Sequence, residues 1–246
     1  MKTILLIGTR SKADFSLYLS HMMTSMEKRV LLVDVTAQQQ YRHGYTRLRK
    51  EEQLFDFQGI DILCGPKSWL QIEEQLRINQ ESTTNYDVVM VDIDTPEALG
   101  SEWPEFDHRF YIGDEDRLHQ TLDVELLHRL FDETENTELS KITFEGKYEL
   151  DSTYFNNLMN NRPRWVSVEY FIELDDLESS LRFKMQHETI IPFKKLSKPY
   201  KETLSELISS IFHVHKEEVK GAAKQSFFRF GSKRKQEIPQ FADTNA

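Results

Sequence analysis

The chain has a single cysteine, Cys64, so no internal disulfide can form, as is usual for proteins of a reducing cytoplasm. No apolar run is long enough to span a bilayer, and the apolar stretch 3–7 is too short for the core of a signal peptide. Acidic residues outnumber basic ones, and the net charge is -10, which argues against binding of nucleic acid by the surface as a whole. These absences favour a cytoplasmic protein. Because Cys64 follows two apolar residues, we expect it to be a buried structural thiol rather than a nucleophile.

What the sequence does contain is a series of short apolar runs separated by segments of helix length. The runs are continuous rather than alternating, as expected for strands that are covered by helices on both faces. A chain of 246 residues can bury one core of this kind, so we expect a single α/β domain. The predicted strands are residues 4–7, 30–33, 59–63, 88–91, 110–112, 141–144, 165–168 and 190–192.

Several of the intervening segments carry apolar residues at helical spacing. Asp14 is placed to cap the first of these helices, whose apolar positions run from Phe15 to Met26. Strands that alternate with helices predict a doubly wound, mostly parallel sheet with helices on both faces, in a domain over residues 1–215. Further helices are predicted at residues 68–76, 116–131 and 197–212, and a polar loop at 132–140.

The segment GTRSKAD, residues 8–14, follows the first predicted strand at the edge where open α/β sheets bind ligands. A phosphate-binding loop needs glycines that turn its N–H groups toward the phosphates, a lysine for the outer phosphates and a hydroxyl for Mg²⁺. This segment supplies Gly8 and Lys12 but lacks a second glycine. It has Ala13 in place of the hydroxyl, and Asp14 adds a negative charge. A plain strand-to-helix turn and a phosphate site are therefore both open.

Asp34 and Asp92 close two later predicted strands, whose ends should lie near this loop. A carboxylate there can hold Mg²⁺ directly or through water, although aspartate also ends strands simply as a turn former. The candidate cofactor-binding residues are therefore Gly8, Lys12, Asp34 and Asp92. The alternatives for the cofactor are ATP with Mg²⁺, or none.

The order of these motifs resembles the MinD/ParA family, the deviant Walker A ATPases that position proteins, plasmids and chromosomes. KRVLLVD at 28–34 is similar to the family's second strand, and YDVVMVDIDTP at 86–96 to its third. IIPF at 190–193 and the predicted helix 197–212 resemble its late strand and last packed helix. The resemblance extends over residues 1–215 and implies a P-loop type of fold that dimerises face to face around nucleotide.

Several positions depart from the family's pattern. Lys12 matches the ordinary phosphate-loop lysine, whereas the signature lysine that reaches across the dimer has no counterpart. Ala13 stands at the Mg²⁺-binding threonine, Thr36 stands at the aspartate that helps to activate water, and residues 144–146 lack the asparagine that reads adenine. Phosphoryl transfer depends on such positioning and electrostatic groups. The resemblance therefore implies a degenerate relative with no catalytic residues and no ATP hydrolysis.

The composition becomes small, basic and polar from about Lys220, and we predict a flexible tail over residues 216–246. Basic residues alternate there with phenylalanines, which suits an anionic membrane surface and is similar to the C-terminus of MinD. Gly221 and Gly231 argue against a stable helix in water. The alternative is a tail that folds back onto the domain or binds a partner protein. The candidate contact residues are Phe227, Phe228, Arg229, Phe230, Lys233 and Arg234.

Two further clusters could carry chemistry. His213 and His215 are two positions apart, a spacing that faces different sides of a helix, so no metal site is predicted. The acidic segment 169–178 is interpreted as a strand-to-helix junction with a capping aspartate. An acidic face for a basic partner stays open as its alternative.

Three functions are compatible with these features. The first is a non-catalytic scaffold or positioning protein that recruits or regulates a membrane-associated assembly, on the inner face of the membrane. The second is an active ATPase that uses Lys12 and Asp92 and cycles on the membrane surface. The third is a DNA-partition or conjugation-associated factor, against which the net charge of -10 counts. Protein partners are expected, a homodimer is a further candidate, and nucleic acid is not expected.

Overall fold

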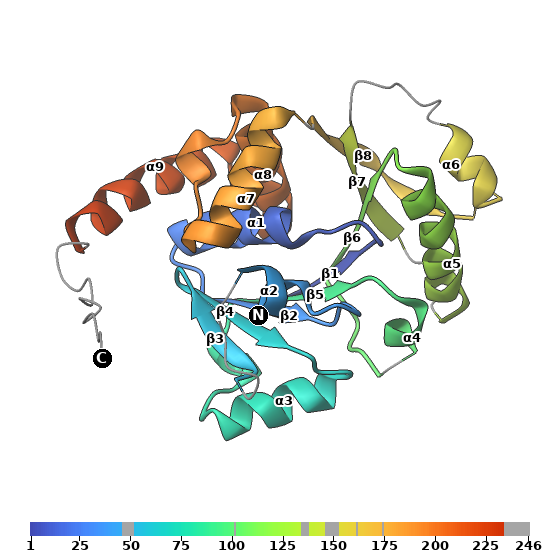
Figure 1. The fold of residues 1–246 in the computed structure, drawn as a ribbon, viewed down its shortest axis with the longest axis horizontal. Coiled ribbons are helices and arrows are strands. Elements are labelled where there is room, and N and C mark those ends of the chain that lie inside the picture. The colour runs from blue at the N-terminus through green and yellow to red at the C-terminus, as the bar shows by residue number, and fades with distance from the viewer. Residues whose placement is uncertain are drawn as a thin grey trace, which may run out of the picture.

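The computed structural model describes residues 1–45, 52–100, 102–133, 138–145, 153–160, 162–173 and 175–233. Eight strands form one sheet in the order β3-β4-β2-β5-β1-β6-β7-β8 (Figure 1). Neighbouring strands are parallel, except for the antiparallel pair β3 and β4 at one edge. The predicted mostly parallel sheet is therefore confirmed. The strands are β1 (Lys2–Ile7), β2 (Val30–Asp34), β3 (Leu54–Phe57), β4 (Ile60–Cys64), β5 (Val88–Ile93), β6 (His108–Asp114), β7 (Glu138–Glu145) and β8 (Arg164–Glu173).

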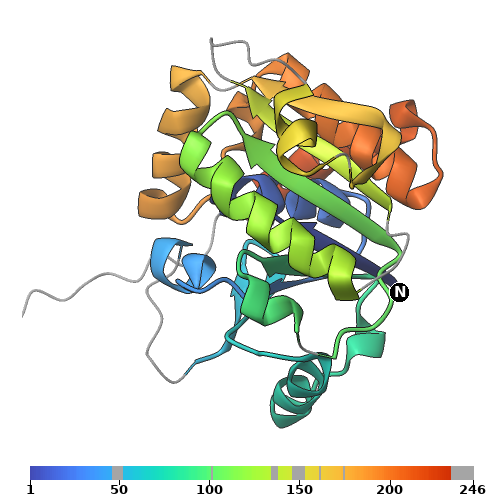
Figure 2. The ribbon, with the colours of Figure 1, turned by 90° about the vertical axis from the view of Figure 1, so that its right-hand side faces the viewer.

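Helices cover both faces of the sheet, as predicted for a doubly wound fold. Helices α1, α2, α7, α8 and α9 pack on one face, and α3, α4, α5 and α6 on the other. Figure 2 shows α5 running across the face opposite α1. The helices are α1 (Ala13–Ser25), α2 (Gln40–Tyr45), α3 (Trp69–Ile78), α4 (Pro96–Leu99), α5 (Arg117–Glu133), α6 (Thr153–Leu158), α7 (Asp176–Glu188), α8 (Lys198–Phe212) and α9 (Lys216–Lys233).

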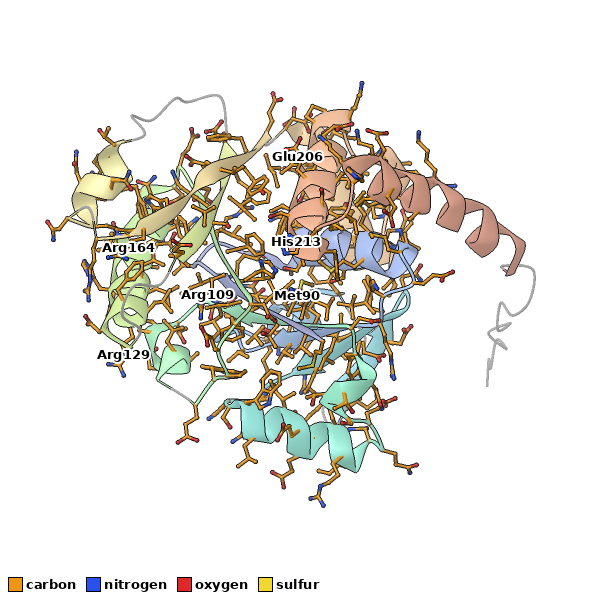
Figure 3. The ribbon with its side chains drawn as sticks, turned by 180° about the vertical axis from the view of Figure 1, so that it is seen from behind. Met90, Arg109, Arg129, Arg164, Glu206 and His213 are labelled. Carbon is orange, nitrogen blue, oxygen red and sulfur yellow. The ribbon has the colours of Figure 1, made fainter. Side chains whose placement is uncertain are left out.

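The central strands explain why the apolar runs are continuous. In β1, Ile4 and Leu6 join the core on the side of α1, whereas Leu5 and Ile7 join the core on the side of α5. Met90 of β5 lies in the middle of the molecule and is fully buried (Figure 3). Since successive residues of a strand face opposite sides, a strand covered on both sides needs apolar residues at every position.

The predicted strand at residues 190–192 is wrong. The structure describes these residues as an irregular segment between α7 and a 3₁₀ turn over Phe193–Lys195. Pro192 has no N–H to donate to a strand ladder, and Phe193 instead packs beside Tyr18 of α1. This segment leads the chain back over α1 into α8, so β8 forms the edge of the sheet.

The segment predicted to be a flexible tail begins as helix α9. Val219 and Ala223 of this helix are buried in the core with α1 and α8. Lys216 and Lys220 form ion pairs of 2.9 and 2.8 Å with Glu202 of α8. Lys216 also pairs with Glu206 of the same helix, the residue labelled in Figure 3. Tertiary packing therefore offsets the low helix propensity of this glycine-containing segment.

The start of the tail segment thus belongs to the folded domain. Among the described residues, no helix combines the length and apolar character needed to cross a bilayer. His213 ends α8 in a left-handed conformation with φ 55°, and His215 precedes α9. Of the candidate contact residues, Phe227, Phe228, Arg229, Phe230 and Lys233 lie within α9, and Arg234 lies outside the described residues.

Candidate functional site

The loop between β1 and α1 is fixed by a close approach of two strands. Gly8 has φ 145°, and a Cβ atom at this position would lie 2.2 Å from the main-chain oxygen of Ile112 in β6. Only glycine fits this approach. Helix α1 begins at Ala13, with Lys12 at the N-cap position and Asp14 inside the first turn. Asp14 therefore does not cap the helix, and the predicted cap is wrong.

Lys12 does not extend from this loop toward open space but folds back into the protein. Its Nζ lies 2.9 Å from Oδ1 of Asp92 at the end of β5, and neither side chain is exposed. The same ammonium donates hydrogen bonds to the main-chain oxygens of Gly8 and Ile93, the latter at 3.3 Å. Three oxygens of the chain itself therefore surround the group that a phosphate-binding lysine would offer to a ligand.

Tyr41 of α2 joins the two aspartates that close β2 and β5. Its hydroxyl donates to Oδ2 of Asp92 at 2.6 Å, and its main-chain N–H donates to Oδ2 of Asp34 at 3.0 Å. The hydroxyl and the N–H of Thr36 both donate to Oδ1 of Asp34, at 2.5 and 3.1 Å. We call Lys12, Asp92, Tyr41, Asp34 and Thr36 the closed network, since each is buried and bonded to another member.

The closed network holds two carboxyl groups against one ammonium group. Burial raises the pKa of Asp34 to about 6, and the charge of Asp92 adds to this rise. The hydrogen bonds from Thr36 and Tyr41 oppose it because they stabilise the carboxylate. Burial beside Asp92 also raises the pKa of Tyr41 well above its ordinary value, so this hydroxyl stays a donor. The network therefore carries its own counter-charge and hydrogen-bond donors.

A second buried carboxylate takes up an N–H group of the loop. Asp123 of α5 accepts a hydrogen bond from the N–H of Thr9 at 2.7 Å, and one from the hydroxyl of Tyr111 at 2.8 Å. Asp123 is fully buried, and burial raises the pKa of this carboxyl group. On the other side of the loop, Ser11 donates to Gln40 at 2.8 Å. Internal partners thus hold the loop where a bound phosphate would be expected to order it.

The four residues chosen from the sequence are brought together in part. Lys12 contacts both Gly8 and Asp92, and Asp34 is linked to Asp92 through Tyr41. Sequence reasoning missed Tyr41 and Asp123. The sequence does carry a signal for Asp123. It precedes three buried apolar residues of α5 by three, four and seven positions, and this spacing places its carboxyl group on the apolar face of the helix. Those buried positions are Leu126, Leu127 and Leu130.

Cys64 lies at the rim of the closed network. It is fully buried at the end of β4, as predicted, with Sγ 3.9 Å from Oδ2 of Asp34. Burial, together with the charge of the neighbouring Asp34, raises the pKa of this thiol to about 12. The thiol is therefore protonated near neutral pH and is not a nucleophile.

A pocket of about 670 Å³ opens beside the loop, between the start of α1, the end of β6 and α7. Five carboxyl groups and two guanidinium groups line it, so its charge opposes that of a phosphate chain. We call it the acidic pocket. Its lining residues are Arg10, Ser11, Asp14, Asp114, His119, Asp175, Asp176, Glu178, Ser179 and Arg182.

A smaller pocket of about 310 Å³ lies at the carboxyl ends of β2, β4 and β5. Thr36, Gly65 and Thr95 are among its lining residues, and Lys67 and Glu97 balance each other in charge. Within the described part of the chain, no group of three or more His, Cys, Asp or Glu side chains is arranged to hold a metal ion.

Neither a family model nor a curated protein matches this sequence. Among solved structures, the MinD cell division protein of Aquifex aeolicus is 11% identical, with 85% of this chain and 98% of that chain covered and a TM-score of 0.49. Apo McdA from Cyanthece is 12% identical, with coverages of 90% and 99% and a TM-score of 0.48. A putative plasmid partition protein of Borrelia burgdorferi, bound to AMPPNP, is 11% identical, with coverages of 86% and 97% and a TM-score of 0.46. Similarity at this level does not say what the chain binds or does.

Proposed function

We propose that this chain is a non-hydrolysing protein of the MinD/ParA type that holds protein partners in an assembly. The observation that carries the proposal is the position of Lys12 inside the closed network. To reach a phosphate group, Lys12 would have to leave Asp92, and a buried carboxylate that loses its partner costs several kcal/mol. The lysine therefore stabilises the fold instead of a ligand.

Other groups at the loop support the same proposal. Ala13 begins α1 without the hydroxyl that would hold Mg²⁺. The N–H of Thr9 is already bonded to Asp123, and the neighbouring acidic pocket would repel a triphosphate. The order of the motifs KRVLLVD and YDVVMVDIDTP keeps the MinD/ParA type as the framework. A scaffold needs this framework but not its phosphate chemistry.

Phosphate release from ATP by the purified full chain tests the loss of hydrolysis. We expect no release above that of a matched protein-free solution with Mg²⁺. Turnover that disappears in Lys12→Ala would show a working ATPase and would overturn the proposal.

Light scattering with and without ATP adds a second measurement. We expect the same molar mass in both, whereas a dimer that forms only with ATP would support the ATPase alternative.

Association with an anionic membrane surface is the second part of the proposal. It rests on the sequence of residues 224–235, where Phe227, Phe228 and Phe230 alternate with basic residues. Because Val219 and Ala223 are buried in the core, a truncation must come after Lys224 to leave the domain intact. We expect anionic vesicles to sediment the full chain and not the 1–224 truncation. Equal sedimentation of both would exclude the tail as the membrane contact.

A DNA-partition role is the remaining alternative, and a gel-shift experiment at low salt tests it. With a net charge of -10, we expect no retardation of random duplex DNA by the full chain. Retardation that is lost as the salt concentration rises would favour the partition role instead.

A further inference from the structure

The acidic pocket contains buried polar groups that have no partner in the protein. Glu178 of α7 is 6% exposed, and neither of its carboxylate oxygens has a hydrogen-bond partner among the described residues. The same holds for Oδ1 of Asp14. Buried carboxylate oxygens are nearly always paired in folded proteins. Unpaired oxygens that line a pocket therefore indicate that a ligand supplies the missing donors.

Arg10 is the second unusual group in this pocket. It is 7% exposed, and its guanidinium lies over the ring of Phe144, 3.5 Å from the centroid. Its Nε is 3.6 Å from Oδ2 of Asp114, which is an ion pair but too long for a hydrogen bond. Within the described residues, Nε and Nη1 have no acceptor. The ring holds the guanidinium in place, and two of its donors are left for a ligand.

The ligand must therefore carry both a cation and an acceptor. Five carboxyl groups against two guanidinium groups select a positively charged ligand, and the unpaired donors of Arg10 require an oxygen on the same ligand. ATP has the wrong charge, and a polyamine has no acceptor. A peptide that presents a lysine or arginine side chain has both, since its main chain supplies carbonyl oxygens.

We propose that the acidic pocket binds a lysine or arginine side chain of a partner protein. Glu178 accepts hydrogen bonds from the cationic end, and Asp14 and Asp176 add to the negative potential. Arg10 donates to a carbonyl oxygen of the same segment. The volume of about 670 Å³ lies within the range of binding pockets and holds one long side chain with its flanking peptide units. This assignment rests on the proposed function, since it requires that no nucleotide occupies the space beside the loop.

Amide chemical shifts of the full ¹⁵N-labelled chain provide the test, with three probes titrated separately. The probes are Nα-acetyl-arginine amide, which has both a guanidinium and carbonyl groups, spermidine, and ATP with Mg²⁺. We expect the arginine probe to give saturable shifts at residues 10–14 and 175–182. Spermidine should bind more weakly there because it leaves Arg10 without an acceptor, and ATP should give no saturable shifts.

Three variants decide whether the pocket is responsible. Glu178→Gln keeps the shape and removes the charge, so affinity for the arginine probe should fall about tenfold, the effect of one charge-assisted hydrogen bond. Asp176→Asn changes an exposed residue that the core does not need, and affinity should fall about threefold by loss of a nearby charge. Glu125→Gln removes the same charge from an exposed position on α5 away from the pocket and should bind like the wild type.

Several outcomes would overturn the proposal. The absence of saturable shifts with the arginine probe, or equal affinity in the wild type, Glu178→Gln and Asp176→Asn, would exclude a cation site. Spermidine that binds as tightly as the arginine probe would show that no peptide acceptor is recognised. Saturable ATP shifts at the loop would also contradict the proposed function, whereas failure of the arginine probe alone would leave that function standing.

Discussion

Buried charged groups lie on both sides of the β1–α1 loop, but they have partners within the protein on only one of the two sides. On the side of β5, Lys12 pairs with Asp92, and Tyr41 bonds to both Asp92 and Asp34, so each member of the closed network has a partner within the protein. On the side of α7, the acidic pocket leaves Glu178 buried and unpaired in the described structure. Both regions lie where a nucleotide site would be expected in a sheet of this topology.

This difference indicates that the closed network contributes to the stability of the fold, whereas the acidic pocket is suited to bind a ligand. A buried ionic group with an internal partner belongs to the fold, and its removal leaves another charge exposed to a low dielectric. A buried ionic group without an internal partner destabilises the fold, and natural proteins retain such groups mainly at sites of function. Removal of the Lys12 ammonium and removal of the Glu178 charge should therefore change stability with opposite signs.

The largest effect is expected from Lys12→Met. This variant keeps an unbranched side chain but leaves Asp92 buried without the ammonium that pairs with it. We expect the free energy of unfolding to fall by about 3–5 kcal/mol, measured by urea denaturation. Lys67→Met is the control, because Lys67 is exposed, and its effect should stay within about 0.5 kcal/mol. Equal effects of the two variants would contradict the closed network.

The second prediction concerns pH. Because burial raises the pKa of Asp34 from 3.8 to about 6, the folded state binds this proton more tightly than the unfolded state. The resulting stability is complete below pH 3.8 and is lost as the pH rises through about 6. The stability of the wild type relative to Asp34→Asn should fall by up to about 3 kcal/mol between about pH 4 and about pH 7. A constant difference over this range would show that Asp34 is not perturbed.

A smaller effect is expected from Tyr41→Phe. This variant removes the hydroxyl that donates to Asp92 at 2.6 Å, and the unfolding free energy should fall by about 2 kcal/mol. Tyr18→Phe is the matched control, since Tyr18 is equally buried on the same face of the sheet and its hydroxyl has no hydrogen-bond partner among the described residues. Thermal denaturation of both variants measures the difference. An equal loss of stability in Tyr41→Phe and Tyr18→Phe would show that the hydrogen bond from Tyr41 to Asp92 does not stabilise the fold.

The smallest effect, and the one of opposite sign, is expected from Glu178→Gln. Because the carboxylate is buried without a partner in the described structure, removal of its charge should raise the free energy of unfolding by about 1 kcal/mol. Urea denaturation at neutral pH measures this gain. A loss of stability comparable to that of Lys12→Met would mean that Glu178 belongs to an internal network after all.

The sequence predicts the central sheet well and its periphery poorly. Strands β1, β2 and β5 are buried on both faces, so their apolar runs are easy to recognise. Strand β3 is an antiparallel edge strand with half-exposed residues, and nothing in its sequence stands out. Helix α7 is predicted only as a junction, because Leu181 and Met185 are its buried apolar residues within a polar segment.

At the site, the sequence predicts which residues come together but not how they point. Parallel strands end at the same edge, which brings Asp34 and Asp92 close to the loop. The direction of Lys12, by contrast, depends on oxygens of Gly8 and of the distant end of β5, and that of Tyr41 depends on the packing of α2. These contacts are tertiary, so no local spacing encodes them. Whether the four residues hold a cofactor stays a prediction.

Within the protein, Asp92, Ile93 and Gly8 surround the ammonium of Lys12 that a phosphate would otherwise bind. Calorimetric titration of ATP and of ADP, each with Mg²⁺, into the purified full chain shows whether these internal partners exclude nucleotide. The closed network predicts no saturable heat beyond that of dilution, because Lys12 stays with Asp92. A saturable signal with a micromolar dissociation constant would show instead that Lys12 leaves Asp92 and that the loop opens for phosphate.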